Sequence, residues 1–503
     1  MSSPTWQPLH PGRPVPMATL PLLPVEGLRA AVLEAVRDGQ RLAAFFGTRL
    51  EPQRVRLTAV LADAGHDLLH AATAEAGQEF PALTPDCPQA HLFEREIAEQ
   101  TGLVPRGHPW LKPVRFVATE YPGAEAAAAT PTIGVMDFFR MQGDEVHEVA
   151  VGPVHAGVIE PGHFRFQCHG ETVYHLEISL GYQHRGIEKR LLGGPHRRTF
   201  CQMQTLAGDT TIGHTSTYCQ VLEALAGTRV PARAQALRGI ALELERLANH
   251  TGDLGALAGD VGFLPTQNYC GAIRGDFLNL TALLCGSRLG RDFLRPGGVG
   301  FDLDQARIDD LRRRLDQAEL EVTSAVELMF AVSSVPARFE GTGTVARQQA
   351  EAFGLVGPAA RACGLRRDIR QDHPLGIYQV HHLPVSTWDT GDVFARASVR
   401  WLEIQQSLRF IREVLASLPA GRAEETPGAL APDSLAVALN EGWRGEICHV
   451  ATTDANGRFS RYKVVDPSFH NWFGLALALR QQAISDFPLC NKSFSLSYCG
   501  FDL

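Results

Sequence analysis

Long stretches in the second half of the chain repeat apolar residues with the spacing of an α-helix. Residues 232–260 place apolar side chains on one face and carry Arg238 and Glu245 outside it. Residues 304–332 form a second such face, and Asp304 is suited to cap the N-terminus of that helix. The apolar positions of the two faces are Leu237, Ile240, Leu244 and Leu247 in the first, and Ile308, Leu311 and Leu315 in the second.

A third helix and a hairpin are predicted nearer the C-terminus. Residues 390–419 carry a mixed apolar stripe, and Pro419 ends it because proline lacks the amide hydrogen that a helix needs. The three helices are apolar enough to pack against one another as a bundle. Residues 443–465 have the pattern of a β-hairpin, with Asn456-Gly457 at its turn.

The first part of the chain mixes the two periodicities. Residues 25–47 begin with apolar residues at helical spacing and predict a helix. Residues 54–62 and 67–76 alternate in the manner of β-strands. A small domain with both kinds of element is therefore expected here.

These patterns predict an α+β fold with four segments. Residues 1–24 are rich in Pro, Ser and Thr and predict a flexible tail. Residues 25–118 form the small α/β domain, and residues 119–147, rich in Pro, Gly and Ala, form a linker. Residues 148–503 form a large, mainly helical domain with β-rich edges.

Composition narrows the classes of function. The 503 residues include 45% hydrophobic and 20% charged residues, and the net charge of −8 argues against a nucleic-acid-binding protein. No run of apolar residues is long enough for a membrane span, and the N-terminus does not resemble a signal peptide. We therefore expect a cytoplasmic protein. The ten cysteines are scattered without a CxxC pair, which indicates buried small side chains rather than disulfides or a thiolate metal site.

One motif near the end of the first domain carries a resemblance. Residues 92–113 contain Glu94-Arg95-Glu96, Gly102 and Gly107-His108-Pro109 at fixed offsets. The segment resembles the closing motif of the 30-kDa-type subunit of complex I. Taken alone, these residues are more typical of a loop–helix connector with a solvated acidic face, and we assign them no catalytic role.

The large domain resembles a second family through longer motifs. It is similar to the large subunit of nickel–iron hydrogenases and to the 49-kDa-type subunit of complex I, and closest to the energy-converting, membrane-bound hydrogenase branch. A 30-kDa-type domain fused ahead of the large subunit is typical of that branch. The motifs are residues 152–166, 181–191, 243–263, 441–450 and 461–472.

The sequence departs from the hydrogenases at the metal ligands. The resemblance implies two CxxC pairs, because a nickel–iron centre needs four thiolates, two of them bridging. Aligned on His214, the early pair falls on Ala207 and Thr210. The C-terminal pair falls on Ser497 and Gly500, and Cys499 lies one position away. We therefore expect no metal and no cofactor bound by this chain.

The sequence also departs from complex I at the quinone site. The resemblance implies a headgroup-binding histidine and tyrosine, but Ile159 stands at the first position and the second falls near Gly208. His155 is the earlier histidine of that motif. The polar residues near the vacated pocket are Glu160, His163, Asp209 and His214.

Two charged residues match family positions with a role in proton handling. Glu188 occupies the place of the proton-relay glutamate, and Arg444 that of the arginine above the active site. Burial raises the pKa of a carboxyl group, which suits a relay near neutral pH. The alternative is a buried structural ion pair, and a buried histidine such as His155, His163 or His214 is more often a hydrogen-bonded core residue.

The resemblance implies a place in a larger assembly. The partners would be a hydrogenase-type small subunit with a 4Fe–4S cluster and antiporter-like membrane subunits, so that this chain lies on the inner face of the membrane. A quinone is one candidate acceptor, and NAD would bind elsewhere, because no GxGxxG motif opens a helix here. The leading hypothesis is a subunit that couples electron transfer to proton or ion movement. The alternative is a non-catalytic scaffold.

Overall fold

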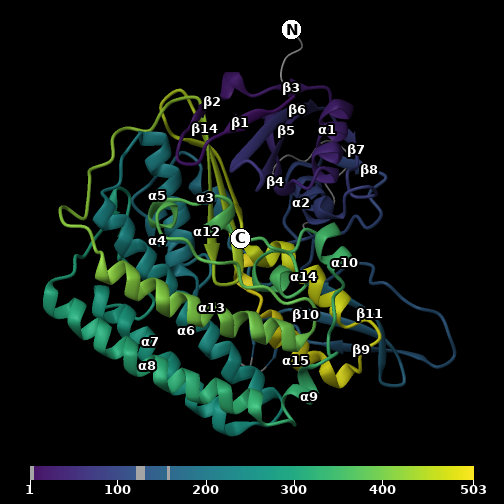
Figure 1. Cartoon of the computed structure of the whole chain (residues 1–503). Helices are drawn as coiled ribbons and strands as arrows, with labels where there is room; N and C mark the ends of the chain where they lie inside the picture. Colours follow the sequence, from purple (N-terminus) through teal and green to yellow (C-terminus); the bar gives the residue numbers. More distant parts are fainter. Residues whose placement is uncertain (1–4, 120–130, 156–158) are drawn as a thin grey trace.

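The computed structural model describes residues 5–119, 131–155 and 159–503. A small unit of a five-stranded sheet, a two-stranded sheet and two main helices precedes a larger unit rich in long helices (Figure 1). The predicted α+β class is therefore confirmed. The linker predicted at residues 119–147 lies partly outside the described residues, and its described end leads into β9 (Val146–Val151).

The sheet of the first unit has the order β1-β6-β5-β4, with β3 beside β6. Helices α1 and α2 pack on this sheet through apolar faces that include Leu28, Val32, Phe93 and Ile97. The elements of the unit are β1 (Gln7–Leu9), β3 (Leu22–Leu23), α1 (Val25–Arg37), β4 (Arg41–Glu51), β5 (Arg54–Asp63), β6 (Leu68–Ala76), β7 (Glu79–Pro81), α2 (His91–Thr101) and β8 (Val104–Arg106).

The helix predicted over residues 25–47 is correct only in its first half. Helix α1 ends at Arg37, and Gly39 turns the chain with a φ of +91°, a conformation that favours glycine. The apolar run from Leu42 to Phe46 is continuous rather than periodic, and it is buried on both sides as strand β4.

The flexible tail predicted for residues 1–24 is wrong over residues 7–23, which contain three paired strands, and residues 1–4 of that prediction lie outside the described residues. Strand β1 pairs antiparallel with β6, and β3 pairs parallel with the same strand. Strand β2 (Val15–Pro16) pairs with β14 of the large unit. These partner strands are distant in the sequence. Their pairing gives a regular structure to a segment whose composition alone suggests a flexible tail.

The large unit is built around helix α6 (Ala232–Asp260), which packs against α7 (Leu264–Cys285) and α13 (Val393–Ala416). Helix α8 (Gln305–Ala331) forms an outer layer beside α7 (Figure 1). The predicted apolar faces are buried, and Asp304 caps α8 by accepting a hydrogen bond from the Arg307 amide at 2.8 Å. Helix α13 ends at Ala416, shortly before Pro419.

Two antiparallel sheets border these helices. The first has the order β11-β10-β9, and the second has the order β16-β15-β14-β2. The predicted hairpin is β15 and β16, with Asn456-Gly457 in the connecting turn. The remaining main elements are β10 (His163–His169), β11 (Thr172–Ser179), α3 (Ile187–Leu191), α4 (Thr199–Met203), α5 (Thr211–Ala226), α11 (Gly357–Arg361), β14 (Ser434–Gly442), β15 (Gly445–Thr453), β16 (Phe459–Val465), α14 (Pro467–Ala478), α15 (Phe487–Phe494) and α16 (Tyr498–Phe501).

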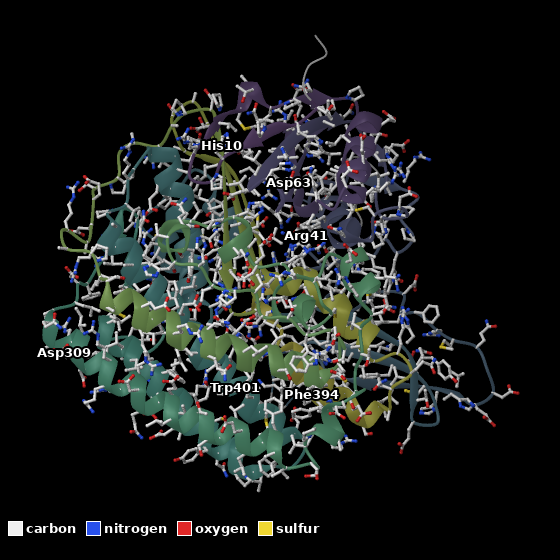
Figure 2. The ribbon with its side chains drawn as sticks, viewed as in Figure 1. His10, Arg41, Asp63, Asp309, Phe394 and Trp401 are labelled. Carbon is white, nitrogen blue, oxygen red and sulfur yellow. The ribbon has the colours of Figure 1, made fainter. Side chains whose placement is uncertain are left out.

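Buried ion pairs join the two units. Arg41 of β4, labelled in Figure 2, pairs with Glu446 of β15 where the units meet. Lys463 of β16 bonds the Glu96 carboxylate of α2 at 2.7 Å. Arg115 donates hydrogen bonds to the Phe501 carbonyl near the C-terminus. Of the helices in the described part of the chain, none combines the length and the apolar character that a membrane crossing requires.

Candidate functional site

Asp209 and Arg444 form the centre of the candidate site. Asp209 lies in the loop before α5, and Arg444 lies in the β14–β15 turn. The guanidinium donates two hydrogen bonds to the carboxylate, at 2.5 and 2.7 Å, and it stacks 3.9 Å above the Trp443 ring. The Asp209 carbonyl accepts hydrogen bonds from the Asn249 amide and the Trp443 indole, both at 3.0 Å. The pair is therefore held in one geometry from both sides.

The two charges of this pair stabilise each other. Burial alone raises the pKa of Asp209, but the Arg444 charge and hydrogen bonds outweigh burial and leave that pKa below its ordinary value. Burial lowers the pKa of Arg444, and Asp209 more than reverses that effect. Both groups are charged at neutral pH.

The loop before α5 meets the C-terminal segment at this site. Arg444 bonds the Ser495 carbonyl, and Arg185 donates hydrogen bonds to the carbonyls of Leu206 at 2.7 Å and Cys499 at 3.2 Å. The C-terminus lies in the interior of the molecule (Figure 1). The two segments that the sequence aligns with the thiolate pairs are thus neighbours in space.

The side chains at the four aligned positions do not fit a four-thiolate centre. Ala207 is buried and has no donor atom, and the Thr210 hydroxyl bonds Asp209 and Arg444. The Ser497 hydroxyl caps α16 by accepting from the Gly500 amide at 2.9 Å. A Cβ atom built on Gly500 would lie 2.6 Å from the Asp466 carboxylate, so a cysteine there would collide with it.

His214 belongs to a buried chain of polar groups beneath this junction. Its two ring nitrogens lie 2.9 Å from the Asp466 carboxylate and 3.2 Å from His449, and His449 bonds the Tyr462 hydroxyl at 2.9 Å. Burial lowers the pKa of His449 well below its ordinary value, with a further contribution from His214. Asp466 both caps α14 and orients His214.

Glu188 lies in a separate charge cluster, and the structure does not pair it with Arg444. It accepts hydrogen bonds from the Lys463 ammonium and the Val464 amide, each at 3.0 Å. Burial alone would raise the pKa of Glu188, but Lys463, Arg461 and Arg115 outweigh it and lower the pKa to about 2. Of the two interpretations left open for Glu188, the lowered pKa fits a buried ion pair rather than a carboxyl that holds a proton near neutral pH.

Glu245 of α6 is the site residue that the sequence reasoning missed. Its carboxyl accepts the amides of Ile212 and Gly213 at 2.7 and 3.1 Å, at the N-terminus of α5. Burial raises the pKa of Glu245 to about 8, and Asp209 adds to the rise, although the two amides favour the ionised form. The available signal was a glutamate in the middle of a long helix, close to the charged residues Glu243 and Arg246.

His155, Glu160 and His163 hold the loop between β9 and β10. The His155 ring lies 2.8 Å from the Gly162 carbonyl, and the His163 ring lies 3.4 Å from the Gly152 carbonyl. Glu160 is exposed and accepts a hydrogen bond from the Tyr498 amide at 3.3 Å. In the described part of the chain none of the three has a hydrogen bond or ion pair with Arg444, whose hydrogen-bond partners are Asp209, Thr210 and Ser495.

The cysteines and the metal-binding residue types are dispersed. Seven of the ten cysteines are buried as predicted, whereas Cys201 is exposed and Cys285 and Cys499 are partly buried. Among the residues that the structure describes, no three His, Cys, Asp or Glu side chains are arranged to hold a metal ion.

Comparison with known proteins identifies the family of the chain. Residues 260–431 match the family described as "Respiratory-chain NADH dehydrogenase, 49 Kd subunit". The chain is 30% identical to formate hydrogenlyase subunit 5 of Escherichia coli, over 84% of this chain and 76% of that protein. It is 31% identical to the carbon monoxide-induced hydrogenase of Rhodospirillum rubrum, over 69% of this chain and 96% of that protein.

A complex I subunit gives a similar match. One subunit of the NADH-quinone oxidoreductase of Dehalococcoides mccartyi is 31% identical, over 64% of this chain and 88% of that protein. The resemblance seen in the motifs of residues 152–472 is therefore confirmed at the level of the family. The chain belongs to the family that unites the 49-kDa-type subunit of respiratory NADH dehydrogenase with the corresponding subunits of membrane-bound hydrogenases.

Proposed function

We propose that this chain is a subunit of a membrane-associated, complex I-like assembly and has no nickel–iron centre of its own. In that assembly it couples electron transfer from a partner's iron–sulfur cluster to the movement of protons or ions. The names of its relatives, which include formate hydrogenlyase, membrane-bound hydrogenase and NADH-quinone oxidoreductase subunits, support such a setting.

The observation that carries this proposal is the chemistry of the junction between residues 205–214 and 495–502. Acid and base side chains fill this junction, and Asp466 occupies the space that a cysteine at position 500 would need. Asp209 and Arg444 supply fixed charges, and Glu245 supplies a carboxyl that holds a proton at neutral pH. Together they can bind a polar group and exchange a proton with it.

The proposed partners follow from the family. They are a small subunit with a 4Fe–4S cluster, antiporter-like membrane subunits, and a quinone as one candidate acceptor, with the chain on the inner face of the membrane. The first unit would be a fused 30-kDa-type domain. The match to formate hydrogenlyase subunit 5 spans 84% of the chain, more than residues 148–503 can supply, so it reaches into the first unit.

A scaffold function is the second candidate. The observation in its favour is that Glu188 forms ion pairs with both Lys463 and Arg461, as a member of a structural ion cluster would. In this case the large-subunit fold would only hold the partner subunits together.

The two candidates differ in the behaviour of the purified complex. We expect Arg444→Met and Glu245→Gln each to leave the subunit composition intact and to lower redox-linked ion transport by at least ~100-fold, as loss of a positioned acid or base does. Glu188→Gln removes the negative charge at position 188 and tests whether transport depends on it. Glu327→Gln, on the exposed face of α8, is the matched control. Unchanged transport in both Arg444→Met and Glu245→Gln would establish the scaffold function instead.

Nickel analysis of the same preparation tests the missing metal centre. We expect less than ~0.1 nickel per chain, because a structural metal site is filled near stoichiometry. One nickel per chain, or hydrogen oxidation by the preparation, would contradict the proposal.

A further inference from the structure

A cavity lies away from Asp209 and Arg444. Its volume is about 390 Å³, and it is bounded by the second half of α5, the first half of α6, residues 369–378 and the end of β14. Gln220 of its lining lies roughly 14 Å along α5 from Thr211, the residue that opens this helix after the loop of Asp209, at 1.5 Å per residue. The cavity shares no residue with the candidate functional site, and its volume falls within the range of small-molecule sites.

Polar atoms without partners face this cavity. Asn440 Nδ2, Gln220 Oε1 and Thr228 Oγ1 are buried, and none has a hydrogen-bond partner among the described residues. Asn440 as a whole is only 6% exposed. An unsatisfied buried polar group costs about 1–3 kcal/mol, so such groups are rare. Three of them, from a strand, a helix and a loop, share one cavity, which indicates that a bound molecule completes their hydrogen bonds.

The charges of the lining favour an anion. Arg229, Arg238 and Arg370 face the cavity, whereas Glu223 is the one carboxylate among the described lining residues. Burial lowers the pKa of His373 to about 4, so that ring is neutral. Arg238 and Arg370 are engaged by the carboxylates of Glu223, Glu243 and Asp368. Arg229 is exposed at the rim and has no ion pair within the described part of the chain, so its charge is available to a ligand.

The rest of the lining is apolar. Leu242 of α6, Ile377 and Leu439 of β14 are buried side chains that face the same space. A molecule that fills the cavity must therefore bury hydrocarbon as well as a charged group. We propose that this cavity is a binding site for a small organic anion, with its carboxylate toward Arg229 and Asn440 and its hydrocarbon part against Leu242, Ile377 and Leu439.

Calorimetric titration of the purified full chain with sodium hexanoate tests this site. We expect saturable binding below ~10 mM, and binding of hexan-1-ol at least ~10-fold weaker because it lacks the charge. Arg229→Ala should weaken hexanoate binding ~10-fold, and Asn440→Leu should weaken it to a similar extent. Because Arg229 is exposed, its substitution leaves the fold intact. Arg313→Ala, on the exposed face of α8 and outside the lining, is the matched control.

Three results would overturn the assignment. They are the absence of hexanoate binding at ~10 mM, equal affinities for hexanoate and hexan-1-ol, and an equal loss in Arg313→Ala and Arg229→Ala. Inorganic phosphate serves as a further probe. If it binds as tightly as hexanoate, the site recognises charge alone and the proposed organic anion is wrong.

Discussion

Glu188 and Glu245 are both buried glutamates of the large unit, yet their surroundings give them opposite properties. Glu188 lies among Lys463, Arg461 and Arg115, which lower its pKa to about 2. Glu245 faces the amides of the first turn of α5 and lies near the negative charge of Asp209, and its pKa is raised to about 8. At neutral pH one residue is a fixed charge and the other holds a proton.

The difference shows that burial alone does not make a proton relay. Desolvation is the largest single influence on both carboxyl groups, and it raises both pKa values. The number of cations within reach decides the outcome, and those cations come from distant parts of the chain. The motif resemblance predicted Glu188 as the relay, whereas Glu245 has the surroundings that a relay near neutral pH requires.

Substitution of Lys463, the central cation of the Glu188 cluster, should cause the largest loss of folding stability. Lys463→Met leaves Glu96 and Glu188 buried with one cation fewer, and loss of a buried ion-pair partner costs about 3–5 kcal/mol. We expect a loss of this size in the free energy of unfolding of the first urea transition at pH 7. Lys492→Met, at a partly exposed lysine, is the control. A loss in Lys463→Met no larger than in the control would contradict the conclusion that Lys463 keeps Glu188 ionised.

The pH dependence of stability should reveal Glu245. Between its unfolded pKa of about 4.3 and its folded pKa of about 8, only the folded state keeps this proton, so stability falls as pH rises. Between pH ~5 and ~7.5, the parent protein should lose about 3 kcal/mol more than Glu245→Gln, whose side chain does not titrate. Urea unfolding of both proteins across this range measures the difference. Parallel pH profiles would mean that Glu245 titrates as an ordinary carboxylate.

Substitution of Arg461, the outer cation of the Glu188 cluster, should cause the smallest loss of folding stability. Arg461 lies 3.2 Å from Glu188, and its side chain is 12% exposed, so its charge is partly screened by water. We expect Arg461→Gln to cost about 1 kcal/mol in urea unfolding at pH 7. Arg458→Gln, at the neighbouring hairpin turn, should be neutral. A cost equal to that of Lys463→Met would show that the cluster shares its charge evenly.

The sequence predicted what depends on local pattern. The helix faces of residues 232–260 and 304–332, the Asp304 cap and the Asn456-Gly457 turn are all present, because each depends on residues a few positions apart. The strands within residues 7–23 could not be predicted, since they depend on pairing with β6 and β14. A continuous apolar run likewise could not distinguish helix from strand at Leu42–Phe46.

The candidate site was predictable only in part. Motif positions identified Asp209, Arg444 and His214, and the structure brings Asp209 and Arg444 into contact and links His214 to Asp466. The protonation of Glu188 was not predictable, because Lys463 is 275 residues away in the sequence. The same holds for Glu245, whose partners are the backbone amides of another helix.

Infrared spectroscopy tests most directly whether Glu245 is protonated and Glu188 is ionised at neutral pH. At pH 7 the protein should show a C=O stretch band of protonated carboxylic acids that loses much of its intensity in Glu245→Gln and keeps it in Glu188→Gln. The part of the band that remains in Glu245→Gln belongs to Glu441, because burial raises the pKa of Glu441 to about 7. Loss of that band in Glu188→Gln, or no change of it in Glu245→Gln, would contradict the account.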